Sequence, residues 1–241
     1  MRGWWQEIAG LVLPVSCGGC GRPRSELCEE CRAALYGAVP RRVRPEPEPA
    51  GLPVVHAAAP YENAVRAVLL AHKERGALGL SRGLGRALAG AVRAGTGRTG
   101  GTAPLLLVPV PSARRAVAAR GHDPTRRIAL ATAAELRRTG MPARVAAVLR
   151  QRRPVADQSG LGARERQENL AGALEVVSGG ERLVAAERVV LVDDLLTTGA
   201  SLAEAARAIG AAGPRAGSGS GTGQAAVVAA SPSAFEINRN G

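Results

Sequence analysis

The feature that most constrains the fold is the segment 189–201, which reads VVLVDDLLTTGAS. Its four leading apolar residues predict a buried strand, because a short apolar run of this kind is typical of a strand covered on both faces. Asp193 and Asp194 follow at the carboxyl end of that strand, and Gly199 permits a tight turn into a helix. Ligands of open parallel sheets bind at this edge, so the segment predicts an α/β fold with a ligand site there.

The same segment has the groups needed to hold a sugar phosphate. Thr197, Thr198 and Ser201 place hydroxyls around Ala200, beside the free N–H groups of a helix N-terminus, where the helix dipole favours an anion. The two carboxylates can accept hydrogen bonds from adjacent ring hydroxyls, which suits a ribose 5-phosphate. The alternative is an ordinary strand, turn and helix with polar capping residues. Receiver domains and phosphatases also carry an acidic pair, but early in the fold and without a following T-T-G-x-S.

Helical and apolar patterns alternate along the rest of the chain. Strands that alternate with helices indicate a parallel sheet covered on both faces. The Arg-rich, apolar-poor segment 151–169 is predicted to be a long mobile loop, and the low-complexity segment 216–224 a flexible insertion. The patterns predict helices over 62–73, 78–94, 125–138 and 201–211, and strands over 105–110, 145–149, 189–192 and 225–230.

All four cysteines lie close together, as Cys17-x2-Cys20-x7-Cys28-x2-Cys31. Two C-x-x-C pairs supply the four thiolates of a tetrahedral zinc site, and a site closed by four protein ligands is structural. Two disulfides, a redox C-x-x-C and an iron–sulfur cluster are the alternatives. The prolines of 41–53 predict a semi-rigid linker. The expected domains are therefore an N-terminal helix and zinc module over 1–40 and an α/β domain over 54–241.

Charge and apolar content limit the partners. The net charge is +12 and the pI about 11.2, which favours polyanions such as nucleic acid or phosphate-rich small molecules. Residues 110–170 hold 13 Arg against 5 acids. Residues 62–234 contain no aromatic side chain, which argues against strong base stacking. No apolar run is long enough to cross a membrane, and no cleavable signal is evident, so no membrane insertion and a cytoplasmic location are expected.

The string 189–201 resembles the phosphoribosyl-pyrophosphate (PRPP) motif of type I phosphoribosyltransferases. Together with the four-cysteine pattern, the chain resembles the ComF family of competence-associated phosphoribosyltransferase-like proteins. Further similar blocks are AHKERG at 71–76, VPVPS at 108–112 followed by Arg120-Gly121, and Gln158…Arg166…Asn169-Leu170. Three places depart from the family pattern: Glu74 stands where an aromatic residue is usual, His122-Asp123 where an aromatic residue and Asn are more frequent, and 216–224 is inserted before the final strand.

The resemblance implies a type I phosphoribosyltransferase-like parallel sheet flanked by helices. It implies that Asp193 and Asp194 act on PRPP and that Pro111 and Ser112 form a diphosphate loop. The cations that follow this loop, Arg114, Arg115 and Arg120, could neutralise the diphosphate. Residues 151–169 would then be a flexible hood that closes over PRPP, with Arg153, Gln158 and Arg166 as contacts. Mg²⁺ would accompany PRPP and neutralise the leaving group.

Two functions follow from these features. The first is a phosphoribosyltransferase that uses Mg²⁺ and PRPP with an unidentified acceptor, in nucleotide metabolism or DNA uptake. The alternative is a non-enzymatic nucleotide sensor or a competence factor that binds single-stranded DNA, with a competence helicase as an expected partner. The sequence leaves turnover undecided.

Overall fold

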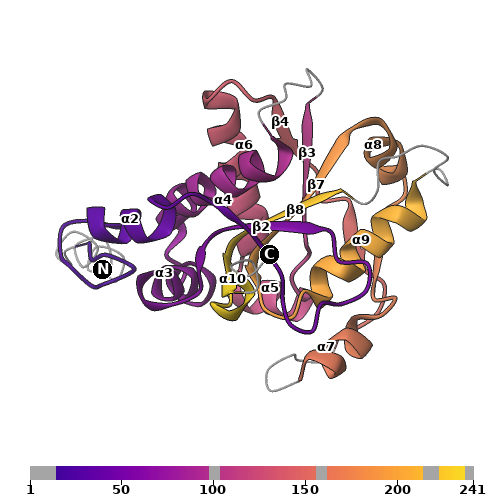
Figure 1. Cartoon of the computed structure of the whole chain (residues 1–241), viewed down its shortest axis with the longest axis horizontal. Helices are drawn as coiled ribbons and strands as arrows, with labels where there is room; N and C mark the ends of the chain where they lie inside the picture. Colours follow the sequence, from indigo (N-terminus) through magenta and orange to yellow (C-terminus); the bar gives the residue numbers. More distant parts are fainter. Residues whose placement is uncertain (1–14, 98–103, 156–161, 214–222, 237–241) are drawn as a thin grey trace, which may run out of the picture.

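The computed structural model describes residues 15–97, 104–155, 162–213 and 223–236, which form an α/β fold around a six-stranded sheet (Figure 1). The strand order is β1-β2-β8-β7-β3-β4, and all neighbouring strands are parallel except the antiparallel edge pair β1 and β2. In that order the strands are Arg41–Val43, Val54–Pro60, Gln224–Ala230, Arg188–Leu196, Leu105–Pro109 and Ala143–Val145. The expected α/β class with a mostly parallel sheet is confirmed.

Helices cover both faces of this sheet, which explains why its central strands are apolar throughout (Figure 1). All five residues of β3 are buried: Leu105 and Leu107 face one core, and Leu106 and Val108 face the other. The first core is built with α2 (Glu29–Tyr36), α3 (Asn63–Glu74), α4 (Ser81–Thr96, after a 3-10 turn at Leu78–Leu80) and α6 (Pro124–Arg138). The second core is built mainly with α9 (Ala200–Ala212) and α10 (Ser233–Glu236).

The segment 145–177 differs from the sequence prediction. Instead of one strand over 145–149, the chain leaves the main sheet after β4, and β5 (Leu149–Gln151) pairs with β6 (Leu174–Val176) in a separate antiparallel sheet. The predicted long loop 151–169 is wrong where α7 (Ala163–Leu170) forms. Glu165 accepts a hydrogen bond from the Gly162 N–H at 2.7 Å, and Leu170 is buried, so the helix has both an N-terminal partner and an anchor.

The N-terminal module packs directly on the α/β domain. Leu27, Cys31 and Leu35 belong to the same apolar core as Val68 of α3. A methyl group at Gly19 would lie 3.3 Å from a Val68 methyl, which shows how closely the loop approaches α3. The predicted linker 41–53 likewise begins with strand β1, whose Val43 is buried, so this part of it belongs to the sheet.

Other predicted features fall partly outside the described residues. Most of the predicted insertion 216–224 does so, whereas Gln224 opens β8. In the parts of the chain that the structure describes, none of the helices combines the length and the apolar character needed to cross a bilayer. The remaining helices are α5 (Arg114–Arg120) and α8 (Gly180–Ala186).

Candidate ligand site at the sheet edge

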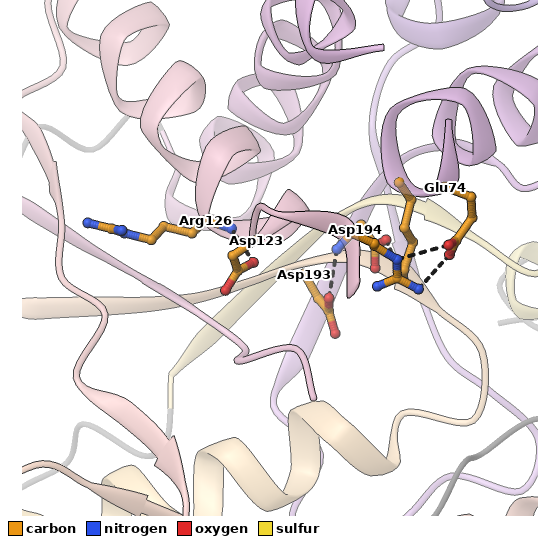
Figure 2. A network of polar contacts seen from close by, with 7 residues as sticks. Glu74, Asp123, Arg126, Asp193 and Asp194 are labelled. Carbon is orange, nitrogen blue, oxygen red and sulfur yellow. Dashed lines mark hydrogen bonds and ion pairs between the residues drawn. The ribbon is translucent and has the colours of Figure 1, made fainter. Parts of the chain in front are cut away.

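The acidic pair lies where β7 extends past its neighbour. Strand β7 continues to Leu196, whereas β3 ends at Pro109, opposite Val192. Asp193 therefore lies beyond the end of β3 while it remains paired with Val227 of β8. This step between two strands places the pair at the carboxyl edge of the sheet (Figure 2), within the last part of β7 rather than directly after the predicted strand 189–192.

The two carboxyl groups have different surroundings. Asp194 is buried and accepts a hydrogen bond from the Lys73 ammonium at 2.7 Å, while its own N–H donates to the Asp193 carboxylate at 2.8 Å. Burial, followed by the nearby charge of Asp194, raises the pKa of Asp193 well above its ordinary value. Burial alone would lower the pKa of Lys73, but the Asp194 carboxylate outweighs it and the pKa is raised. Asp194 is thus held by its hydrogen bond from Lys73, whereas the neighbouring Asp193 takes up a proton more readily than an ordinary aspartate.

A tight turn connects the acidic pair to helix α9. Gly199 has a φ of +77°, a left-handed conformation that glycine adopts without strain. A methyl group there would also lie 3.0 Å from Leu52 and 3.2 Å from Pro49, so the predicted linker covers this turn. Thr197 and Ser201 lie on either side of Gly199, next to the N-terminus of the 13-residue helix α9. The arrangement fits an anion at the helix N-terminus.

The residues around this edge line one cavity of about 770 Å³. That volume lies within the range of small-molecule sites. Eight predicted site residues line the cavity: Asp193, Asp194, Thr197, Ser201, Pro111, Ser112, Arg115 and Arg120. The structure thus brings together the end of β7, the start of α9 and the loop after β3.

Arg166, on helix α7, does not line the cavity but contacts Thr197, which does. Its Nη1 donates to the Thr197 hydroxyl at 3.2 Å. Its Nε is buried and has no hydrogen-bond partner among the described residues. A buried, unpartnered guanidinium N–H beside the turn is a donor that a ligand oxygen could satisfy.

The structure gives other predicted residues different positions. Arg153 does not line the cavity; it donates to the carbonyls of Asn169 and Ala171 at 2.9 Å each and so stabilises the C-terminal end of α7. The side chains of Thr198 and Ala200 are likewise outside the cavity lining, and Ala200 is buried. Gln158 lies outside the described residues.

Several lining residues were not predicted to form the site. One of them is Lys73, near the C-terminal end of α3, which contacts Asp194. By contrast, Arg120 was expected beside the diphosphate; it lines the cavity and makes a two-pronged ion pair with Glu74. The cavity is also lined by Thr125, Gln151 and the apolar side chains of Val155, Leu170 and Leu174. Lys73 belongs to the AHKERG block of the sequence, but its contact with Asp194 is apparent only in the folded structure.

The four cysteines form a second candidate site, remote in sequence from the first. All are free, and their sulfur atoms lie within 4.8 Å of one another. The Sγ atoms of Cys20 and Cys28 are 3.6 Å apart, close to the ~3.8 Å edge of a tetrahedron with Zn–S bonds of about 2.3 Å. The four thiols can therefore hold a metal such as zinc.

Backbone donors prepare one of these sulfurs as a ligand. The Cys28 N–H donates to the Cys17 Sγ at 3.3 Å. Burial by itself raises the pKa of Cys17, but hydrogen bonds from the backbone of Cys28, Cys20 and Gly19 lower it to about 6. A thiolate at neutral pH is the form that binds a metal.

No model of a known protein family matches the chain, and no curated protein matches it. The function therefore has to be argued from the geometry of the cavity.

Proposed function

We propose that the chain is a phosphoribosyltransferase-like protein that binds PRPP, or a related ribose 5-phosphate ligand, together with Mg²⁺. The observation that carries the proposal is that Asp193 and Asp194 share one cavity with the turn before α9 and the loop after β3. The acidic pair supplies hydrogen-bond acceptors for ribose hydroxyls, and the turn before α9 supplies an anion site for the 5-phosphate. The loop after β3 leads to Arg115, whose positive charge suits a diphosphate.

The charges on the cavity wall support this assignment. Arg115 and Arg120 line the same cavity as the two acids, and the wall thus carries both acidic and basic side chains. A ligand with hydroxyls in its middle and phosphates at its ends matches that distribution. The Nε of Arg166, which has no partner among the residues that the structure describes, adds a donor near Thr197, where the 5-phosphate would lie.

The oxygen groups of the wall also suit Mg²⁺ bound with a diphosphate. Mg²⁺ prefers oxygen ligands and commonly combines one or two carboxylates with substrate phosphates. Asp194 is engaged by Lys73, which leaves Asp193 as the carboxyl group on this wall that would face the ion or the ribose hydroxyls. When bound, Mg²⁺ would neutralise charge on the leaving diphosphate. The chain's own part is to hold the ribose and to keep the diphosphate beside Arg115 and Arg120.

Pentosyl transfer is the reaction that such a site supports. It requires a positioned sugar and a stabilised leaving group more than a side-chain nucleophile. The apolar side chains of Val155, Leu170 and Leu174 offer a surface for an acceptor or for the exclusion of water.

Direct binding of single-stranded DNA is the less favoured alternative. Much of the basic charge of 110–170 is already paired with acids, which weakens the field available to a polyanion. The pairs are Arg120–Glu74, Arg138–Glu135, Arg144–Glu187, Arg150–Glu175, Arg152–Glu175 and Arg164–Glu168.

The proposal is tested by a ligand screen on the full chain. Thermal shift with Mg²⁺–PRPP, nucleotides and a single-stranded 20-mer should give the largest stabilisation with PRPP, since a ligand that binds the folded state raises its stability. A diphosphate-release assay on the hits then separates an enzyme from a binding protein. Stabilisation by the 20-mer and not by PRPP would overturn the proposal.

A further inference from the structure

Helix α5 borders the cavity without being packed into the protein. It contributes Arg115, Ala116 and Arg120 to the wall, yet none of its seven residues is buried. Because apolar burial does little to hold this helix in place, its position depends more on its polar contacts.

The main polar contact of α5 joins it to the end of α3. The Arg120 Nε and Nη2 donate to the two oxygens of Glu74 at 2.9 and 2.7 Å. Arg120 lines the cavity, whereas Glu74 does not. Glu74 thus holds a cavity cation from outside the cavity.

We propose that Glu74 is an internal competitor for Arg120, and that Arg120 exchanges the Glu74 carboxylate for diphosphate oxygens when PRPP binds. This inference rests on the proposed function. It makes Glu74 a residue that sets the affinity and the diphosphate specificity of the site, without contacting the ligand.

The geometry of the pair supports an exchange. The planar guanidinium binds carboxylate and phosphate in the same two-pronged manner, and Glu74 occupies two of its five N–H donors on one edge. The side chains of Arg120 and Glu74 are 22% and 45% exposed. An ion pair with this much solvent contact is weak, so a multiply charged diphosphate can displace it.

The ion pair of the adjacent residue Lys73 with Asp194 is less exposed to solvent than that of Glu74 with Arg120 on the carboxylate side. The Asp194 side chain that Lys73 contacts is only 8% exposed, and a buried carboxylate that loses its cation is strongly destabilised. Lys73 on α3 therefore stays with Asp194, whereas Arg120 on α5 is able to exchange Glu74 for a ligand. The two adjacent residues Lys73 and Glu74 hold one fixed and one exchangeable contact.

Isothermal titration calorimetry with Mg²⁺–PRPP and with ribose 5-phosphate tests the exchange. Glu74→Gln removes the competitor, so it should tighten Mg²⁺–PRPP binding roughly threefold or more and leave ribose 5-phosphate binding unchanged. Arg120→Gln should weaken Mg²⁺–PRPP binding about tenfold or more. In the double variant, Glu74→Gln should add nothing to the effect of Arg120→Gln.

Glu135→Gln is the matched control. It breaks another two-pronged pair, with Arg138, and changes the net charge equally, but it lies ten residues and about 15 Å along α6 from Thr125 at the cavity. It should leave both affinities unchanged.

Three results separate the claims. Equal or weaker Mg²⁺–PRPP binding by Glu74→Gln overturns the exchange while the proposed function stands. A gain that persists in the Arg120→Gln background overturns it too, because the effect is then one of general charge. Failure of the unchanged chain to bind Mg²⁺–PRPP overturns the proposed function itself.

Discussion

The Lys73 ammonium lies 2.7 Å from the Asp194 carboxylate, although the two residues are 121 positions apart in the chain. The contact joins the end of α3 to the end of β7, and through β7 to the turn before α9. Because Asp194 is buried, Lys73 is what allows a charged carboxylate to remain at this edge of the sheet.

Replacement of Lys73 by Gln should destabilise the fold. It leaves a buried carboxylate without its cation, which costs roughly 1–3 kcal/mol. Urea denaturation at pH 7, followed by circular dichroism, measures the change in the free energy of unfolding.

Lys73→Arg is the control for that substitution, since it keeps the charge and can still donate to Asp194. It should retain most of the stability lost by Lys73→Gln. If Lys73→Gln is as stable as the unchanged chain, the ion pair does not hold Asp194.

The imidazole of His72 should make stability depend on pH. His72 is fully buried on α3, with its Nδ1 3.3 Å from the Ala77 carbonyl and with the His122 ring and the charge of Arg127 nearby. Burial lowers the pKa of His72 below its ordinary value of 6.5. Protonation thus favours the unfolded chain, so the contribution of His72 is complete above pH 6.5 and is lost as the pH falls from there toward the folded-state pKa.

The measurement is the slope of unfolding free energy against pH from 8 to 5. One group can contribute at most about 1.4 kcal/mol per pH unit, and His72→Gln should make the slope shallower by part of that amount. The slope, rather than the stability at one pH, is the readout, because the substitution itself disturbs the core. Identical slopes in both proteins would contradict the assignment.

Removal of a metal from the cysteine cluster should destabilise helix α3 as well as the N-terminal module. Cys17, Cys28 and Cys31 are buried in the same core as Val68 of α3. One equivalent of zinc is expected after gentle purification, and a strong chelator should lower the melting temperature of the whole chain and increase hydrogen exchange in α3.

Re-addition of Zn²⁺ should restore both properties, which controls for nonspecific effects of the chelator. A metal content below half an equivalent would contradict the metal site. Loss of structure confined to residues 15–36, with α3 unchanged, would contradict the shared core.

The acidic pair and its turn could be predicted from sequence because their signal is local. The apolar run before Asp193, the turn at Gly199 and the helix after it follow one another within 13 residues, and the structure has them in this order, with β7 running four residues further than the predicted strand. The short spacing of the cysteines allowed the second site to be predicted for the same reason.

The parts that sequence did not predict depend on distant contacts. The contact of Lys73 with Asp194 exists only once α3 packs beside β7, and no local pattern reveals it. Strands β5 and β6 have three residues each and are held by pairing across a long stretch of chain, so their periodicity is too short to recognise. Helix α7 has few apolar residues and depends on Leu170 and on contacts such as that of Arg153 with its C-terminal end.

The central claim, that this cavity binds PRPP through the acidic pair, is tested most directly by calorimetry with Mg²⁺–PRPP. The Asp193→Asn, Asp194→Asn double variant removes both charges without changing side-chain size. Asp123→Asn is its control, because Asp123 is an N-cap outside the cavity lining and Asn serves equally well as an N-cap. The account predicts binding by the unchanged chain and by the control, and a loss of about 100-fold or more in the double variant, since charge-assisted hydrogen bonds contribute roughly 1.5–3 kcal/mol each. Equal affinity of the double variant and the unchanged chain would contradict it.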